Sequence, residues 1–172
     1  SSAFYLFFIT LRDFFNKKYK NLSQNIAHFG FSLLILSILF NNIFSTEIIT
    51  NLKIGETFEN EKFKIKFVDI VKKNEKNFQA IIGKLRVEDA NGDVITLKPE
   101  LRIYNQPNIV TSEAYIKTNL ITDKFMTMNS VQNKDYFNIR YQNKPLMIWI
   151  WFSVLLITFG GLISLFKERN EN

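Results

Sequence analysis

Two long apolar segments limit what this chain can fold into more than any other feature of its sequence. The first runs from Ile26 to Phe44 and is interrupted only by His28, two Ser and an Asn pair, and the second runs from Leu146 to Phe166. Each has the ~20 residues that a helix needs to cross ~30 Å of hydrocarbon. Neither has the pattern of a signal peptide, because no small-residue cleavage site follows the first and the second is C-terminal. We predict two transmembrane helices.

A third apolar stretch runs from Ala3 to Phe15, but it carries Arg12 and Asp13 and is too short to span a membrane alone. It could be the tail of a longer helix, and a chain that opens with Ser-Ser rather than Met fits a truncated, split or processed protein. We therefore expect five parts: the end of a preceding helix with a basic segment (1–20), a transmembrane helix (22–44), a β domain (45–144), a second transmembrane helix (145–166) and a tail (167–172).

Charges beside the first span predict its orientation. Four basic residues precede it and one acidic residue opposes them: Arg12, Lys17, Lys18 and Lys20 against Asp13. The positive-inside rule places this flank in the cytoplasm or its equivalent, so that residues 45–144 lie on the outer side and 167–172 return to the inner side. Trp149 and Trp151 then fall at the outer end of the second span, where an aromatic belt is expected.

The residue types that are missing exclude much metal and redox chemistry. The chain has no Cys, which excludes a disulfide framework, a thiolate zinc site, covalent haem attachment to this chain and a Cys nucleophile. It has one His, so any metal centre needs ligands from elsewhere. The net charge of +6 comes mainly from dispersed Lys without an Arg-rich patch, and we predict no nucleic-acid partner.

The segment between the spans carries strand signals throughout. From Glu61 to Phe67 charged and apolar residues alternate, which predicts a half-buried strand. Further strands are expected at 94–104, 111–117, 125–128 and 136–141, giving six to eight in all. The predicted fold is a membrane protein of the α + β class, in which two transmembrane helices flank an antiparallel all-β extracytoplasmic domain, closed as a small barrel or sandwich near the membrane.

Two glycines predict local irregularities in this sheet. The apolar positions from Phe78 to Ile82 share one phase, and the phase shifts by one residue after Gly83, which predicts a β-bulge there. Asn91-Gly92 lies between two alternating runs and predicts a type I′ hairpin, because both residues tolerate positive φ.

His28 is the leading candidate for chemistry because it lies near the inner end of the first predicted span. An ionisable side chain within a span is by default a functional hypothesis, and neutral His is the commonest protein ligand of haem iron. Asn25, His28 and Ser32 have the spacing of one helix face, and Gly30 would let a bulky group approach. The alternatives are a His at headgroup level that bonds a neighbouring helix or water, and a helix–helix interface of small and polar residues.

A haem iron held by His28 would ordinarily need a second axial ligand, and the chain offers only Met126, Met128 and Met147 as candidates. All three are predicted on the outer side, about 30 Å of membrane away from His28. The second ligand is therefore expected from another chain or from a missing segment.

A polar row is predicted on one face of the 94–104 strand, where Glu100, Arg102 and Tyr104 follow in succession. Arg102 could offer a bidentate fork to a carboxylate, or the row could be a solvated face with an in-strand ion pair worth under about 1 kcal/mol. Glu113 is less specific. A Gly-rich phosphate loop, a nucleophile elbow and a paired Asp/Glu constellation are all missing from the sequence, which argues against a self-contained hydrolase or transferase.

Five blocks, in order along residues 22 to 166, carry a family resemblance. They are Asn25-Ile26-Ala27-His28-Phe29-Gly30, Gly55-Glu56-Thr57, Leu97-Lys98-Pro99-Glu100-Leu101-Arg102-Ile103-Tyr104, Thr111-Ser112-Glu113-Ala114-Tyr115-Ile116, and the closing Lys144-Pro145-Leu146, Trp149-Ile150-Trp151 and Gly160-Gly161-Leu162. Together they resemble the C-terminal portion of the CcmF family, the membrane haem lyase component of cytochrome c maturation in the CcmF/NrfE/CcsA superfamily. One departure is Leu101, where the family often has Lys.

The resemblance implies that His28 is the second transmembrane ligand of a haem b, with its partner His on another polypeptide or on a part of the chain outside these residues. The tryptophan-rich haem-binding segment, two external haem-ligating histidines and the first transmembrane histidine of the family would all lie upstream. In the family, haem is presented to apocytochrome c so that the CxxCH thiols add to its vinyl groups. The transmembrane haem b would supply reducing equivalents. This chain is then expected to be part of a holocytochrome c synthase and not catalytic alone.

The same resemblance implies the partners and the compartment. The partners would be the remainder of the CcmF-type protein or its other split subunits, a CcmE-like haem chaperone, a CcmH-like subunit, apocytochrome c and the membrane. The location would be the bacterial inner membrane with a periplasmic β domain, or the mitochondrial inner membrane with the β domain in the intermembrane space. Two alternatives remain open: a membrane-tethered β domain that binds a partner or supports assembly without haem, and a sensor whose outer domain binds a ligand.

Overall fold

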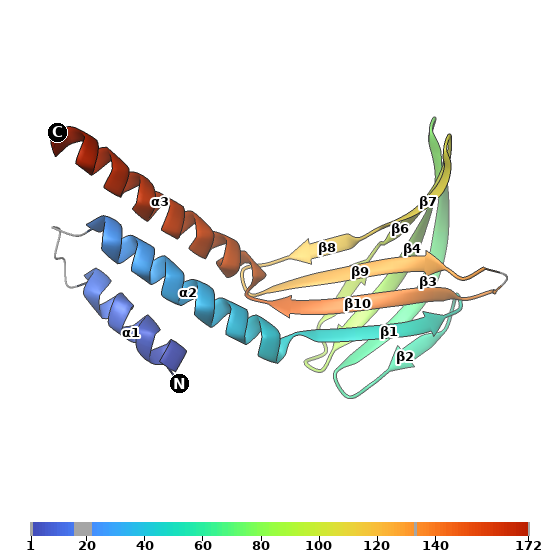
Figure 1. The fold of residues 1–172 in the computed structure, drawn as a ribbon. Helices are drawn as coiled ribbons and strands as arrows, with labels where there is room; N and C mark the ends of the chain where they lie inside the picture. Colours follow the sequence, from blue (N-terminus) through green and yellow to red (C-terminus); the bar gives the residue numbers. More distant parts are fainter. Residues whose placement is uncertain (1, 16–21, 133, 172) are drawn as a thin grey trace. The chain divides into compact units, whose positions relative to one another are not determined.

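The computed structural model describes residues 2–15, 22–132 and 134–171, which divide into two compact units. The helical unit falls within Ser1–Ser45, Asn119–Asp123 and Lys144–Asn172, and the β unit comprises Thr46–Thr118 and Lys124–Asn143. The fold is the predicted one, that of a membrane protein in which one apolar helix precedes an antiparallel β domain in the sequence and another follows it (Figure 1).

The helical unit contains α1 (Ser2–Phe15), α2 (Leu22–Phe44) and α3 (Met147–Glu171). Leu22–Phe44 and Met147–Phe166 are long and apolar enough to cross a membrane, and neither stretch contains a charged residue. The segment predicted as a tail from residue 167 continues α3 as helix to Glu171. Lys17, Lys18 and Lys20 lie outside the described residues, so the predicted orientation stays a prediction.

Small residues let α2 and α3 approach closely as an antiparallel pair. A Cβ added at Gly30 would lie 2.9 Å from Leu156 Cβ and 3.0 Å from the Ser153 carbonyl oxygen. A Cβ added at Gly160 would lie 2.8 Å from the Ser23 carbonyl oxygen and 2.9 Å from Ala27 Cβ. Helices that associate in lipid gain little from the hydrophobic effect, and such close backbone packing replaces it.

The second neighbour of α2 is α1, as Figure 1 shows. The Thr10 and Ser32 hydroxyls hydrogen-bond each other at 2.7 Å, and Ser32 also donates to the Phe29 carbonyl at 2.8 Å. Phe4 packs edge-to-face on Phe40 with ring centroids 5.8 Å apart. Two of the faces of α2 are therefore covered, one by each neighbouring helix.

The β unit is built from two antiparallel sheets, with strand orders β1-β10-β9-β8 and β2-β3-β4-β6-β7, and β5 pairs with β4. The strands are β1 (Thr46–Leu52), β2 (Thr57–Glu59), β3 (Phe63–Asn74), β4 (Phe78–Asp89), β5 (Val94–Leu97), β6 (Glu100–Asn105), β7 (Asn108–Glu113), β8 (Tyr115–Thr118), β9 (Thr122–Ser130) and β10 (Phe137–Pro145). The core draws buried side chains from both sheets, which makes the domain a sandwich rather than a closed barrel.

The described residues form ten strands, more than the six to eight predicted. The predicted 94–104 strand is split into β5 and β6 at Lys98-Pro99, because Pro99 has no N–H to donate to a ladder. The predicted 111–117 strand is split at Ala114, where the chain passes from β7 in one sheet to β8 in the other.

The predicted bulge at Gly83 is wrong, and the irregularity lies in the facing strand. The β3–β4 register passes from Phe67↔Leu85 to Asp69↔Lys84, so that Val68 is the extra residue. Gly83 instead faces the core, where an added Cβ would lie 2.8 Å from Met128 Sδ.

The Asn91-Gly92 hairpin joins β4 to β5 as predicted, but its turn type differs. Gly92 has a φ of 83°, whereas Asn91 is not among the described residues with positive φ, which excludes type I′. The loop runs over four residues between Asp89 and Val94. The Asp89 carboxylate accepts hydrogen bonds from the N–H groups of Asn91 at 3.0 Å and Asp93 at 3.1 Å, and this stabilises the longer loop.

Candidate functional site

His28 lies on the side of α2 that neither α1 nor α3 covers. Gln24, one turn before it, is exposed, as are Phe31 at 53% and Ile38 at 48% farther along the helix. These positions are four, three and seven residues apart and therefore lie on one face of the helix, which we call the open stripe of α2. No residue within 2–15, 22–132 and 134–171 hydrogen-bonds the exposed imidazole.

The structure separates the residues that were predicted to share a face with His28. Ser32 is fully buried against α1 through Thr10, and the space beside Gly30 is filled by α3. The prediction that Gly30 admits a bulky group is therefore wrong. Both residues fix the rotation of α2 instead, and His28 is left facing away from the two packed sides.

None of the methionines can join His28 at one iron. Met126 and Met128 are completely buried in the core of the β unit. Met147 begins α3, next to Pro145, whose carbonyl accepts a hydrogen bond from the Asn41 side chain at 2.6 Å. Asn41 is thirteen residues after His28 on α2, a rise of about 20 Å along the helix axis.

The donor set of this chain therefore fits one axial position of a haem and not a complete site. The described residues contain no group of three or more His, Asp or Glu side chains that could hold a metal ion. A haem held by this exposed imidazole would need its opposite ligand and the rest of its pocket from another polypeptide segment.

The predicted polar row lies on the face of β6 that points away from the core, since Leu101 between its members is 2% exposed. Arg102 Nη2 lies 3.0 Å from Glu100 Oε2, and the guanidinium carbon lies 5.1 Å from the Phe78 ring centroid. Hydrogen bonding to Glu100 raises the pKa of Arg102 above its usual range. The guanidinium is thus already paired, which favours the ion-pair interpretation over carboxylate recognition.

Two of the sequence blocks that carry the family resemblance pair directly in the β unit. In the β6–β7 register Glu100 lies opposite Glu113, and Arg102 lies opposite Thr111. The Thr111 hydroxyl donates to Glu113 at 3.4 Å. The pairing of β6 with β7 therefore brings the Glu113 carboxylate beside the Glu100–Arg102 pair.

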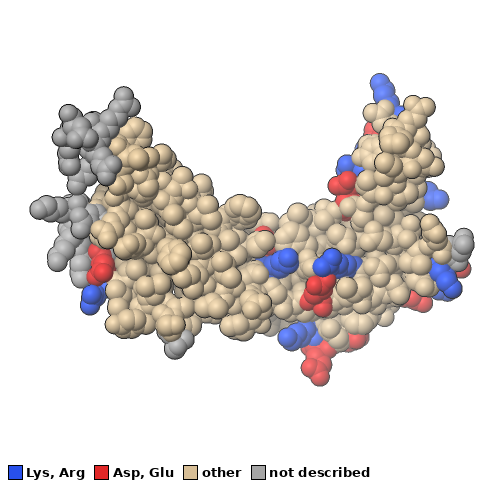
Figure 2. All heavy atoms as spheres, in the orientation of Figure 1, with Lys and Arg blue, Asp and Glu red and all other residues tan. Residues whose placement is uncertain are grey.

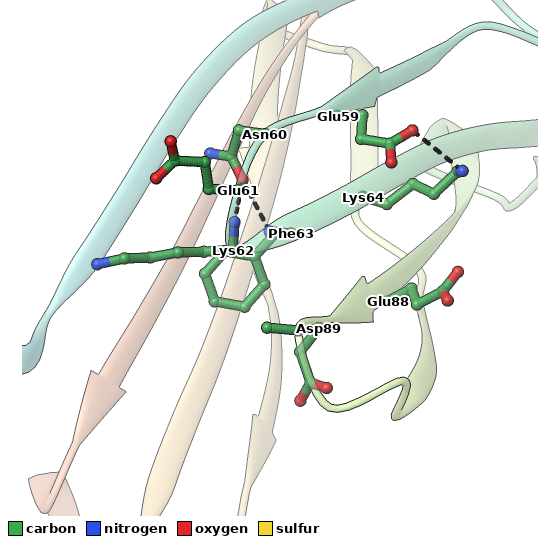
Figure 3. A pocket seen from close by; sticks show the side chains of 9 residues that line it. Glu59, Asn60, Glu61, Lys62, Phe63, Lys64, Glu88 and Asp89 are labelled. Atoms are coloured by element: carbon green, nitrogen blue, oxygen red, sulfur yellow. Dashed lines mark hydrogen bonds and ion pairs between the residues drawn. The ribbon is translucent and has the colours of Figure 1, made fainter.

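Most of the charged side chains visible in Figure 2 lie over the β unit. A polar pocket beside the β2–β3 turn is lined by four acidic residues of the β unit: Glu59, Glu61, Glu88 and Asp89. Figure 3 shows that their carboxylates point in different directions. Glu59 is paired with Lys64 at 3.0 Å, and the Asn60 side chain accepts from the Phe63 N–H at 2.7 Å. This arrangement stabilises a turn and does not converge on a ligand.

One structural feature of the helical unit was missed by the sequence analysis. The Asn119–Asp123 turn is fixed to the start of α3 by two hydrogen bonds, from Leu146 N to the Ile121 carbonyl at 2.7 Å and from Trp149 Nε1 to the Leu120 carbonyl at 2.8 Å. Leu146 adopts a positive φ of 57° where the chain turns from β10 into α3. The one sequence signal was an apolar Leu120-Ile121 pair directly after an Asn.

Comparisons with known proteins agree with this architecture. The chain is 25% identical over 144 residues to the cytochrome c-type biogenesis protein CcmF of Haemophilus influenzae and 30% identical over 143 residues to the cytochrome c-type biogenesis protein ccl1 of Rhodobacter capsulatus. These matches cover 84% and 83% of this chain but 22% of each relative. The chain thus spans about a fifth of the length of these relatives.

A third relative and a solved structure match a larger share of the chain. The cytochrome c-type biogenesis protein NrfE of Haemophilus influenzae is 25% identical over 98% of this chain and 27% of its own length. The solved structure titled Cytochrome c Heme Lyase CcmF has the same fold, with a TM-score of 0.65 and 20% identity over 91% of this chain and 27% of that one. A family model described as the CcmF C-terminal beta-sandwich matches residues 43–145, more than half of the chain, and the chain therefore belongs to this family.

Proposed function

We propose that this chain is the C-terminal part of a haem lyase for cytochrome c biogenesis, and that His28 supplies one axial ligand to a b-type haem in the membrane. The observation that carries the proposal is the exposed imidazole, unpaired among the described residues, on the open stripe of a spanning helix. An ionisable side chain in a span ordinarily faces protein or a cofactor, so this stripe needs a cover. The relatives are named as a cytochrome c-type biogenesis protein and a cytochrome c haem lyase, and we therefore propose haem as the group that covers this stripe.

The packing of the helical unit supports the role of His28 as a positioned ligand. Close contact at Gly30 and Gly160 and the Thr10–Ser32 hydrogen bond hold α2 in one rotation, which keeps the imidazole on the open side. The ring must be neutral to offer a nitrogen lone pair to iron. When bound, the haem would supply electrons that keep the iron of the transferred haem ferrous.

The rest of the assembly is proposed from the missing second ligand and from the family to which the chain belongs. The second ligand is proposed to come from the remainder of a CcmF-type protein or from another split subunit, and this chain is not catalytic alone. A CcmE-like haem chaperone, a CcmH-like subunit and apocytochrome c are the further proposed partners. The β unit is proposed to lie on the periplasmic side of a bacterial inner membrane or in the mitochondrial intermembrane space.

The test is haem spectroscopy on the assembled complex. In the co-expressed assembly, His28→Gly is expected to abolish the low-spin b-type spectrum while the subunits still co-purify, and added imidazole is expected to restore it by filling the vacated position. Gln24→Ala, one turn away on the same exposed stripe, is the matched control and should keep the spectrum.

The alternative function has a distinct outcome. If His28→Gly retains an unchanged b-type spectrum, the imidazole is not a ligand, and the chain is better described as a membrane-tethered β domain that supports assembly. If His28→Gly prevents co-purification, His28→Met keeps a side chain of similar reach that can bind iron, and a His/Met type of spectrum in that variant would support ligation.

A further inference from the structure

The turn that joins β8 to β9 has an apolar tip. Leu120 is 70% exposed and Ile121 is 67% exposed, whereas tight turns that face water ordinarily carry Gly, Asn, Asp or Ser. The other described large apolar side chains that are at least 65% exposed all lie on the three helices: Tyr5, Phe15, Ile43, Trp151 and Leu165. The exposed fractions of the two tip residues are therefore typical of the apolar residues on the helices and not of those on the strands.

Hydrogen bonds within the turn hold this tip in one conformation. The Asn119 side-chain oxygen accepts from the N–H groups of Ile121 at 2.9 Å and Thr122 at 2.6 Å. The Asn119 N–H donates to the Thr122 carbonyl at 3.1 Å. The two apolar side chains are thus presented on a closed turn rather than on an open loop.

The carbonyl groups of both tip residues are also paired. Leu146 N donates to the Ile121 carbonyl, and the Trp149 indole donates to the Leu120 carbonyl. In hydrocarbon an unpaired backbone carbonyl costs several kcal/mol, because there is no water to bond it. Because both carbonyl groups accept hydrogen bonds from the protein, this cost does not arise for them when the turn moves from water into hydrocarbon.

The apolar surface continues from the tip onto α3 without a charged residue. Leu120, Ile148, Trp149 and Phe152 line one apolar hollow, and the Trp149 and Phe152 rings pack edge-to-face at 5.9 Å. Exposed apolar residues then recur every three or four positions along the helix: Ile148, Phe152, Leu155, Phe159, Leu162 and Phe166. The tip extends the exposed apolar stripe of α3 beyond the first turn of the helix.

We propose that the Leu120–Ile121 tip is inserted into the bilayer at the N-terminal end of α3, among the acyl-chain segments next to the headgroups. This insertion anchors the β8–β9 turn to the membrane surface. The partner is the lipid itself, since the tip is uncharged and continuous with the exposed apolar stripe of a helix long and apolar enough to span a membrane. The Trp149 ring then lies at the interface with its N–H paired to protein, as Trp in aromatic belts requires. This proposal does not depend on haem.

The test uses the absence of native Cys, which makes single-Cys labelling simple. Leu120→Cys and Ile121→Cys, each labelled with an environment-sensitive fluorophore, are placed in the full assembly in phosphatidylethanolamine–phosphatidylglycerol vesicles. Both labels are expected to emit at shorter wavelength and to be quenched by lipids brominated near the headgroup more than by lipids brominated near the chain end.

Two further positions calibrate the result. Leu155→Cys on α3, with 55% exposure, should be strongly quenched, and Val94→Cys on β5, with 51% exposure, should be unquenched. Tip labels that match Val94→Cys would show that the tip is in water and would overturn the proposal. Tip labels with shortened emission but no quenching would show that protein covers the tip, which also overturns it. Because both tip side chains point outward, either labelled variant decides the outcome.

Discussion

Large buried side chains stabilise the β unit, whereas small residues that permit close helix packing stabilise the helical unit. In the β unit large apolar side chains such as Phe67, Leu85 and Tyr141 are completely buried. In the helical unit many large apolar side chains remain exposed, while the neighbouring helix leaves no room for a Cβ at Gly30 or Gly160. Water drives burial in the first unit, whereas lipid removes that driving force and leaves close packing and hydrogen bonds in the second.

This difference changes what an unusual residue means in each unit. Exposed apolar residues are ordinary on α3 but need an explanation at the Leu120–Ile121 turn. An exposed polar side chain is ordinary on the β unit but needs an explanation at His28 within a span. The two proposals above come from these two exceptions.

Removing a large side chain should affect the β unit most. Phe67→Ala empties a completely buried position that packs edge-to-face on Phe137 at 5.5 Å, and we expect a loss of about 3–5 kcal/mol in the free energy of unfolding. The measurement is urea unfolding of the detergent-solubilised protein. The matched control is Ile49→Ala on β1, at 61% exposure, for which we expect a change within about 0.5 kcal/mol. Equal losses at the two positions would contradict the comparison.

Adding one methyl group should affect the helical unit more than the β unit. Gly160→Ala places a Cβ 2.8 Å from the Ser23 carbonyl oxygen, and because backbone cannot move aside cheaply we expect the α2–α3 pair to lose about 1–3 kcal/mol. Gly83→Ala places its Cβ equally close to Met128 Sδ, but the flexible thioether can shift, so we expect less than about 1 kcal/mol.

The neighbouring glycine supplies the control for this pair of substitutions. A Cβ at Gly161 would meet nothing within 4 Å, so Gly161→Ala should leave the midpoint of SDS-induced unfolding unchanged or slightly raised. A lower midpoint for Gly161→Ala than for Gly160→Ala would show that helix contact is not what the glycine provides.

The sequence was sufficient for features that depend on local pattern. The spans follow from apolar length without a charged residue, and the Phe63–Phe67 alternation predicts the buried positions that β3 shows. The Val68 bulge and the division of strands between two sheets depend on which strand pairs with which, and this long-range choice leaves no local signal.

The candidate site divides in the same way. The choice of His28 as the candidate follows from its residue type and its place in a predicted span. The face that it occupies was not, because the rotation of α2 is fixed by contacts with Leu156 on α3 and Thr10 on α1, more than a hundred and about twenty residues away in sequence. Packing between residues far apart in sequence places Gly30 in the α2–α3 contact and leaves His28 exposed.

The smallest expected effect belongs to an ion pair at the exposed β3–β4 turn. Lys73 Nζ lies 2.6 Å from Glu75 Oε1, and this contact lowers the pKa of Glu75 below its usual value of about 4.3. A carboxyl with a lowered folded-state pKa stabilises the fold above its unfolded pKa, and this contribution disappears as the pH falls through the folded value. An NMR titration of the Glu75 carboxyl carbon should therefore have a midpoint below the ordinary one, and Lys73→Gln should move it back up. Because both side chains are solvent-exposed, salt should weaken the shift, and an identical midpoint in the two proteins would show that the pair does not form in solution.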